Sequence, residues 1–258
     1  MAQLRDASVE AARVAAEFVR EKARDRLGLD VREKQAADFV SEVDTGAETR
    51  IRDVLSSLVP GAAVVGEELS PTASMAGETV FVVDPLDGTT NFLHGFPAYA
   101  VSIAALTDGE IAAAVVLNIP GGELYTATRG GGAWRDGARI RVSGVDTPRR
   151  ALIGTGFPFK QLEFVERYLG QFERITRAQA GIRRAGSAAL DLAWVASGQF
   201  DGFWESRLAP WDIAAGILLV REAGGRVTDF TGHDIAPAHT PVVASNGVLH
   251  EWLLRSLQ

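Results

Sequence analysis

Residues 79–92 read TVFVVDPLDGTTNF, an apolar run that ends in a turn rich in acids and hydroxyls. The apolar part is typical of a buried strand, which places Asp84 at the strand's end. Pro85 and Gly88 then bend the backbone sharply, so the carboxylate of Asp87 returns towards that of Asp84. Two like charges this close raise each other's pKa unless a cation lies between them. The stretch therefore predicts a strand followed by a carboxylate turn that is able to hold a cation.

The same turn offers further oxygen atoms to a ligand. The Leu86 carbonyl is a candidate metal ligand, and Thr89 and Thr90 add hydroxyl groups. A purely structural interpretation stays open, in which the aspartates only form the turn and a threonine caps a helix.

Acidic residues also follow or begin other predicted elements. Glu67, in Gly66-Glu67-Glu68, comes directly after a short apolar run, and Asp212 opens an apolar helix. The ends of neighbouring strands meet at one edge of a sheet, so Glu67 gains meaning only if its strand lies beside that of Asp84. Asp212 is either an ordinary N-cap or a ligand at a helix N-terminus that also favours anions. A Gly-Ser pair, Gly186-Ser187, opens another helix and is a weak binding signal.

Composition excludes several kinds of site and partner. The chain has 258 residues and a net charge of -7, so bulk attraction to nucleic acid is not expected. It contains no cysteine, which excludes disulfides, thiolate zinc sites and cysteine nucleophiles. With four histidines, a histidine-rich centre is not expected either, and oxygen ligands select hard cations such as Mg²⁺ or Mn²⁺. Neither a signal peptide nor a membrane span is recognisable, so we expect a cytoplasmic protein without membrane contact.

Helical periodicity predicts several amphipathic helices. The first covers residues 3–27, and residues 31–43 are expected to be extended or looped. A second helix is expected to begin at Thr45, with Glu48 closing a capping box, and to stop at Pro60-Gly61. Later helices are expected at residues 162–177, 187–197, 211–222 and, capped by Asn246, up to residue 257.

Strand signals alternate with tight turns. Two Asp-Gly pairs, Asp108-Gly109 and Asp136-Gly137, predict hairpin turns. Besides residues 79–83, strands are expected at residues 62–65, 99–107, 110–118, 123–128, 139–142, 151–155 and 242–245. The aromatic residues Phe200, Phe203 and Trp204 are interpreted as core, and His94 as a structural or surface residue. A soft boundary is expected near residues 144–150, where glycine, proline and arginine cluster.

Over nearly its whole length the chain resembles the inositol monophosphatase family, a lithium-sensitive, metal-dependent group of sugar phosphatases. The resemblance rests on four motifs in order: Gly66-Glu67-Glu68, Asp84 to Phe92, Arg184 to Ala189, and Trp211-Asp212 through Gly224-Gly225. It implies an α/β (α+β) fold, a layered αβαβα sandwich in one phosphatase domain, residues 1–258. Residues 1–145 would form an N-terminal lobe with an antiparallel sheet and most metal ligands. Residues 146–258 would form a lobe with a smaller mixed sheet and the specificity residues.

The resemblance also implies roles for individual residues. Two to three Mg²⁺ ions, with Mn²⁺ able to substitute, would be held by Glu67, Asp84, the Leu86 carbonyl, Asp87 and Asp212. Glu67, Asp44 and Thr89 would be catalytic and would position the attacking water. The substrate would contact Glu67, Leu86, Asp87, Gly88, Thr89, Gly186, Ser187, Ala188, Glu205 and Asp212. Lys34 would lie on a loop over the site.

The implied activity is Mg²⁺-dependent hydrolysis of a small polyol phosphate monoester by in-line attack of a metal-activated water. Inositol 1-monophosphate is the leading substrate. Histidinol phosphate, fructose 1,6-bisphosphate and a 3′-phosphoadenylate stay open as alternatives, as does a non-catalytic binding protein with the same fold. The resemblance further implies a homodimer and inhibition by lithium.

Overall fold

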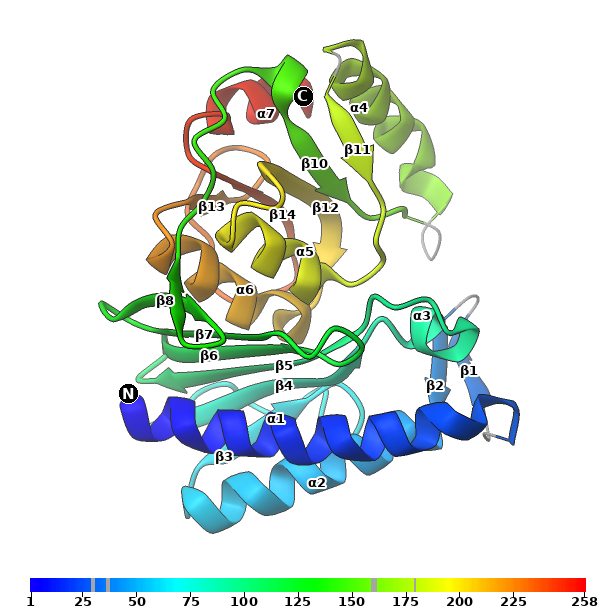
Figure 1. Ribbon diagram of the computed structural model, residues 1–258, viewed down its shortest axis with the longest axis vertical. Coiled ribbons are helices and arrows are strands. Elements are labelled where there is room, and N and C mark those ends of the chain that lie inside the picture. Colours follow the sequence, from blue (N-terminus) through cyan, green and yellow to red (C-terminus); the bar gives the residue numbers. More distant parts are fainter. Residues whose placement is uncertain (29–30, 36–37, 159–161, 179) are drawn as a thin grey trace.

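The computed structural model describes residues 1–28, 31–35, 38–158, 162–178 and 180–258, with the backbone alone for the described part of residues 26–40 (Figure 1). The chain begins with helix α1 (Ala2–Lys22), which continues into the 3₁₀ helix η1 (Ala23–Gly28). The second α-helix is α2 (Glu42–Leu58). Between them, β1 (Val31–Gln35) and β2 (Asp38–Ser41) form a two-stranded antiparallel ribbon. Lys34 was expected on a loop but belongs to strand β1, and its side chain lies outside the described residues.

The larger sheet has seven strands in the order β3-β4-β5-β6-β7-β8-β9. Its first pair is parallel and all later pairs are antiparallel. The strands are β3 (Ala63–Gly66), β4 (Thr79–Asp87), β5 (Ala100–Thr107), β6 (Glu110–Asn118), β7 (Leu124–Thr128), β8 (Gly132–Arg135) and β9 (Ala138–Ile140). Short helix α3 (Thr89–His94) follows β4. Hairpins at Asp108-Gly109 and Asp136-Gly137 were predicted and are confirmed, since all four residues have the positive φ of such turns.

The smaller sheet is mixed and has five strands in the order β11-β10-β12-β14-β13. They are β10 (Leu152–Thr155), β11 (Gly181–Arg183), β12 (Gly202–Leu208), β13 (Arg226–Thr228) and β14 (Thr240–Ser245). The remaining helices are α4 (Val165–Arg177), α5 (Ala188–Ala196), α6 (Pro210–Glu222) and α7 (His250–Ser256), with 3₁₀ turns η2 (Pro148–Arg150) and η3 (Leu162–Phe164).

These elements stack in five layers, as Figure 1 shows from bottom to top. Helices α1 and α2 cover one face of the larger sheet, and α5 and α6 lie between the two sheets. Helices α4 and α7 cover the outer face of the smaller sheet. Phe203 and Trp204, adjacent on β12, point into the cores on opposite sides of that sheet. The predicted αβαβα sandwich and the core assignment of these aromatic residues are thus confirmed.

Helix α1 packs closely because its buried face is built from small residues. Ala11, Ala12, Ala15 and Ala16 are fully buried against α2 and the larger sheet. Alanine favours the helix and lets neighbouring backbones approach. None of the helices in the described part of the chain combines the length and apolarity needed to cross a bilayer.

Two predicted helix starts were wrong. Helix α2 begins at Glu42, with Ser41 as N-cap and Asp44 closing the capping box, so Thr45 and Glu48 lie inside the helix. Asp44 closes the capping box in place of Glu48 because its carboxylate accepts hydrogen bonds from the backbone N–H of Ser41, at 2.8 Å, and from the Ser41 hydroxyl, at 2.6 Å. The last helix begins at His250, and Asn246 lies upstream of it, where it accepts the backbone N–H of Leu249 at 3.0 Å.

Burial makes His250 a source of acid sensitivity. Its ring is fully buried, with Nε2 2.9 Å from the Thr228 hydroxyl and Nδ1 2.9 Å from the Ser245 hydroxyl. Burial, assisted by the positive charge of Arg226, lowers the pKa of His250 from 6.5 to about 4. The unfolded chain therefore binds this proton first as the pH falls. Stability from the neutral ring is present above pH 6.5 and is lost between pH 6.5 and about 4.

We expect His250→Gln to flatten this acid response. Between pH 7 and pH 4.5 the wild type should lose about 2 kcal/mol of unfolding free energy more than the variant does. Urea unfolding at both pH values measures the difference. His94→Gln, at an exposed position, serves as the control and should follow the wild type. An equal pH response of wild type and His250→Gln would contradict this account.

Candidate active site

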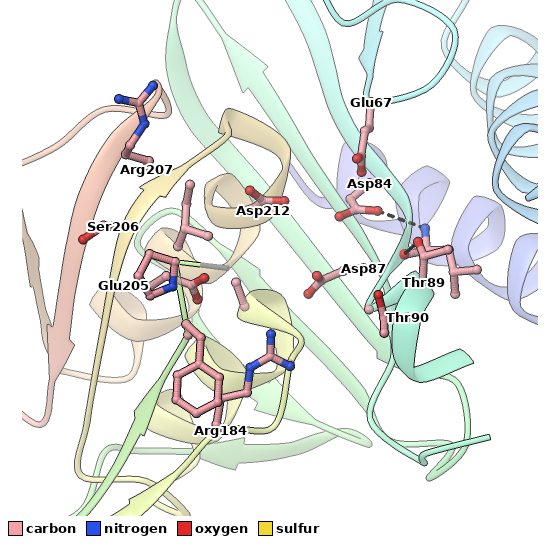
Figure 2. A pocket seen from close by; sticks show the side chains of 18 residues that line it. Glu67, Asp84, Asp87, Thr89, Thr90, Arg184, Glu205, Ser206, Arg207 and Asp212 are labelled. Atoms are coloured by element: carbon pink, nitrogen blue, oxygen red, sulfur yellow. Dashed lines mark hydrogen bonds between the residues drawn. The ribbon is translucent and has the colours of Figure 1, made fainter. Parts of the chain in front are cut away.

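Three carboxylates from distant segments meet where β3, β4 and α6 approach one another (Figure 2). Strand β3 runs parallel to β4 with Gly66 opposite Val83, which sets Glu67 beside Asp84. Asp212, in the first turn of α6, completes the group, and carboxylate oxygens of the three residues lie within 4.8 Å of one another. The adjacency on which the interpretation of Glu67 depended is therefore confirmed.

The carboxylate group has the electrostatics of a cation site. Asp84 is only 2 % exposed, and this burial is the main cause that raises its pKa well above the usual value. The negative charges of Glu67, Asp87 and Asp212 raise it further. Burial, followed by Glu67 and Asp87, likewise raises the pKa of Asp212. A divalent cation among these oxygens would remove the repulsion, and a donor set made only of oxygen suits a hard cation. These residues therefore fit Mg²⁺.

Asp87 connects the carboxylate turn to the second half of the chain. Its Oδ2 accepts the hydroxyl of Ser187 at 2.6 Å and the backbone N–H of Ala189 at 2.7 Å, both at the start of α5. Ser187 also caps α5 by accepting the backbone N–H of Leu190, at the helix start that the sequence predicted. Because Ser187 is only 1 % exposed, it lies behind the wall of the cleft.

The predicted pair of Asp44 and Thr89 is in direct contact. The Thr89 hydroxyl donates to Asp44 Oδ1 at 2.8 Å and lies 3.1 Å from the Leu86 carbonyl oxygen. Asp44 is 1 % exposed, and burial raises its pKa against the opposing hydrogen bonds from Ser41 and Thr89. The preceding Gly88 has φ of 94°, and a Cβ there would lie 2.8 Å from the Ala98 carbonyl oxygen. Glycine is therefore required to bring Thr89 to this position.

A cleft of about 210 Å³ extends from the carboxylates towards the smaller sheet. Its walls include the expected residues Gly88, Gly186, Ala188 and Glu205. Glu205 enters from β12 over Gly156, where a Cβ would lie 2.0 Å from the glutamate carboxylate. The geometry thus joins a carboxylate group, a hydroxyl–carboxylate pair and a second acidic wall in one cleft.

Other residues of the cleft were not predicted as site residues, although Arg184 opens one of the four motifs. Arg184, Ser206 and Arg207 line it together with Phe157 and Pro158. Strand β12, which carries two of them, was not predicted, because its second half is polar and its pairing with β14 is irregular between Glu205 and Leu208. No periodic signal marks such a segment.

Glu48 was also misread, since it anchors the turn that carries Glu67. Its fully buried carboxylate accepts the backbone N–H of Glu68 at 2.7 Å and of Leu69 at 3.2 Å. Arg52 pairs with it at 3.0 Å. A Cβ at Gly66 would lie 2.1 Å from Glu48 Oε1, so the preceding glycine makes room for this contact.

We expect Glu48→Gln to lower the unfolding free energy by about 2 kcal/mol. The variant loses the ion pair with Arg52 and places a side-chain NH₂ group against the N–H donors of Glu68 and Leu69. If the carboxylate group acts in phosphate hydrolysis, as the resemblance implies, displacement of Glu67 should also lower phosphate release about tenfold. Glu42→Gln is the control, since Glu42 pairs with Lys22 at the surface and should change stability by less than about 0.5 kcal/mol. Denaturant unfolding and a phosphate assay measure both effects. Equal stability of the two variants would contradict the anchoring role.

Known proteins resemble this chain in sequence and in structure. The sequence matches the model of the inositol monophosphatase family over residues 1–258. It is 45% identical to the Nus factor SuhB of Pseudomonas aeruginosa, over 97% of this chain and 94% of that protein. It is 50% identical to the inositol-1-monophosphatase of Rhizobium meliloti, over 79% of this chain and 77% of that protein. The crystal structure of extragenic suppressor protein suhB from Bartonella henselae superposes with a TM-score of 0.92, at 41% identity, over 98% of this chain and 97% of that chain.

Proposed function

The chain belongs to the inositol monophosphatase family, and on that premise we propose that it hydrolyses the phosphate monoester of a small polyol, with inositol 1-monophosphate as leading substrate. The observation that carries the proposal is the three-carboxylate group within 4.8 Å, set in one cleft with Thr89 and Glu205. Oxygen donors for cations thus lie beside groups that are able to bind water and alcohol.

We propose that Glu67, Asp84, the Leu86 carbonyl, Asp87 and Asp212 hold two to three Mg²⁺ ions, for which Mn²⁺ can substitute. Bound Mg²⁺ supplies neutralisation of phosphate charge, a lowered pKa of water and stabilisation of the leaving oxygen. The chain itself holds the acidic side chains in place. Leu86 N–H donates to Asp84 Oδ1 at 3.0 Å, and Ala209 N–H donates to Asp212 Oδ2 at 2.6 Å.

Thr89 and Asp44 would orient the attacking water. Since the Thr89 hydroxyl gives its proton to Asp44, its oxygen keeps lone pairs to accept a hydrogen bond from that water. Glu67, on the adjacent strand end, would help to position the water and take up its proton. Backbone N–H groups of Gly88 and Thr89 would bind phosphate oxygens, so that the water attacks phosphorus in line without a covalent enzyme intermediate.

The alcohol would lie against the wall formed by Gly186, Ala188 and Glu205, with Ser187 supporting it from behind. A carboxylate such as Glu205 accepts hydrogen bonds from neighbouring hydroxyls, which favours a polyhydroxylated alcohol. Histidinol phosphate, fructose 1,6-bisphosphate and a 3′-phosphoadenylate are the alternative substrates. We further propose a cytoplasmic homodimer.

A second candidate role, as a binding protein with this fold, is favoured by the relative named Nus factor SuhB, a name that states no hydrolytic activity. The two roles differ in their need for the carboxylate group. A binding role requires the fold, whereas hydrolysis requires the acids to be charged and correctly placed.

Phosphate release from a panel of small phosphate monoesters, with and without Mg²⁺, tests the proposed function. We expect Mg²⁺-dependent turnover with the highest kcat/KM for inositol 1-monophosphate, and inhibition by lithium at limiting Mg²⁺. Turnover that prefers one of the alternative substrates would replace the leading substrate. Absence of turnover on the whole panel would reject hydrolysis in favour of the binding role.

A further inference from the structure

A second cavity borders the proposed active site. Its volume is about 390 Å³, and it shares Ser206 and Arg207 with the cleft of the carboxylates. Its apolar walls include Phe164, Phe230 and Pro241. A ligand with its phosphate at the carboxylates could therefore extend past Arg207 into this space.

The bulge in β12 gives Arg207 its unusual position. Successive side chains of a regular strand point to opposite faces, yet Glu205, Ser206 and Arg207 all line the same cleft. The pairing of β12 with β14 is irregular at this point, and Arg207 has φ of 59°. Among the described residues other than glycine, positive φ otherwise occurs at two aspartates in hairpin turns. Arg207 holds this conformation without such a turn, which points to a use for its side chain.

Two arginines give the second cavity a positive character. The Arg207 guanidinium lies 5.4 Å from the Phe164 ring centroid, and that of Arg167 lies 5.8 Å from the Phe230 ring centroid. Within the described part of the chain, neither guanidinium forms an ion pair. Asp229 is the acid in the lining, and its Oδ1 already accepts three hydrogen bonds from Thr231 and His233. Stacked guanidinium groups keep their N–H edges available for an anion.

Figure 2 shows Arg207 beyond Glu205 and Asp212, on the side of the cleft away from Thr89. Its charge is therefore separated from the place where the reacting phosphate would bind. We propose that Arg207, with Arg167, forms a second anion subsite that binds a phosphate or carboxylate group on the alcohol part of the substrate. This inference rests on the proposed function and adds to it that, of two substrates with the same alcohol, the one that carries a second negative group binds more tightly.

A matched pair of substrates tests the subsite. Fructose 1,6-bisphosphate carries a distal phosphate that fructose 1-phosphate lacks, and each is assayed for release of the 1-phosphate with Mg²⁺. Arg207→Gly removes the guanidinium while suiting the positive φ, so the variant should fold. We expect it to raise KM for the bisphosphate about tenfold more than KM for the monophosphate, with kcat for the bisphosphate changed less than its KM. Arg167→Gln should show the same selectivity, and Arg207→Lys should restore part of it.

An equal change in both KM values, or no change, would overturn the subsite. If the wild type hydrolyses neither sugar phosphate, the proposed function fails on these substrates, and calorimetric binding of the bisphosphate decides the subsite separately. Binding weakened about tenfold in Arg207→Gly would then support the subsite, and equal binding by wild type and variant would overturn it.

Discussion

Asp84→Asn is expected to lower Mg²⁺-dependent phosphate release by about 10³-fold and, at the same time, to raise the melting temperature of the metal-free protein. Asparagine has nearly the shape of aspartate and still accepts the Leu86 N–H that now lies 3.0 Å from Asp84 Oδ1. The substitution therefore removes the charge at the centre of the carboxylate group and changes little else.

The gain in stability follows from the direction of the pKa shift. Burial first, then Glu67, Asp87 and Asp212, raise the pKa of Asp84 well above 3.8. The unfolded chain thus releases this proton at lower pH than the folded chain, so stability is lost as the pH rises through the folded pKa. At neutral pH without metal, the Asp84 carboxylate therefore destabilises the folded state. Removal of its charge should increase the unfolding free energy by about 1–2 kcal/mol.

Thermal unfolding in EDTA and in Mg²⁺ separates the two effects. Mg²⁺ should raise the melting temperature of the wild type, because a ligand that binds only the folded state stabilises it, and should raise that of Asp84→Asn much less. Asp53→Asn, on the exposed face of α2, is the matched control and should behave as the wild type. Turnover of Asp84→Asn within a few-fold of wild type would remove Asp84 from the proposed metal site.

Local patterns were sufficient to predict much of the fold. The strand before Asp84 and the two hairpin turns at Asp-Gly pairs depend mainly on residues adjacent in the sequence. All three of these elements were predicted correctly. The stacking of layers came from the family resemblance, because periodicity does not tell which face of a sheet a helix covers. The start of helix α2 was predicted wrongly because both Asp44 and Glu48 are suitable residues to close a capping box. Glu48 instead contacts Glu68 and Leu69, some 20 residues away in the sequence, and this contact is not visible in the local pattern.

The candidate site was predictable only in part for a similar reason. Glu67, Asp84 and Asp212 could be named from strand ends and a helix start, but their approach depends on β3 pairing with β4 and on α6 packing against β4 and β5. Arg207 gave no signal, because its place in the cleft results from a bulge and not from a sequence pattern. Charged residues brought to a cleft by an irregularity of the backbone are thus the part that sequence reasoning misses.

The contact between Thr89 and Asp44 leads to the second prediction of large effect. Thr89→Val keeps the shape of the side chain but removes the hydroxyl that donates to Asp44 at 2.8 Å. If this hydroxyl orients the attacking water, kcat should fall by about 10²-fold or more while KM changes little, since substrate contacts remain. The Asp44 carboxylate, 1 % exposed, would also lose one of its hydrogen bonds, which should lower the unfolding free energy by about 1–2 kcal/mol.

Thr89→Ser provides the control that separates catalysis from packing. Serine retains the hydroxyl and loses a methyl group, so it should keep kcat within a few-fold of wild type while it lowers stability slightly. A structural role for Thr89 predicts that activity follows stability in both variants. Orientation of water predicts instead that activity follows the hydroxyl, because the Thr89 oxygen accepts from water only while its proton is held by Asp44. Comparable kcat values for Thr89→Val and Thr89→Ser would therefore reject Thr89 as the group that directs the water.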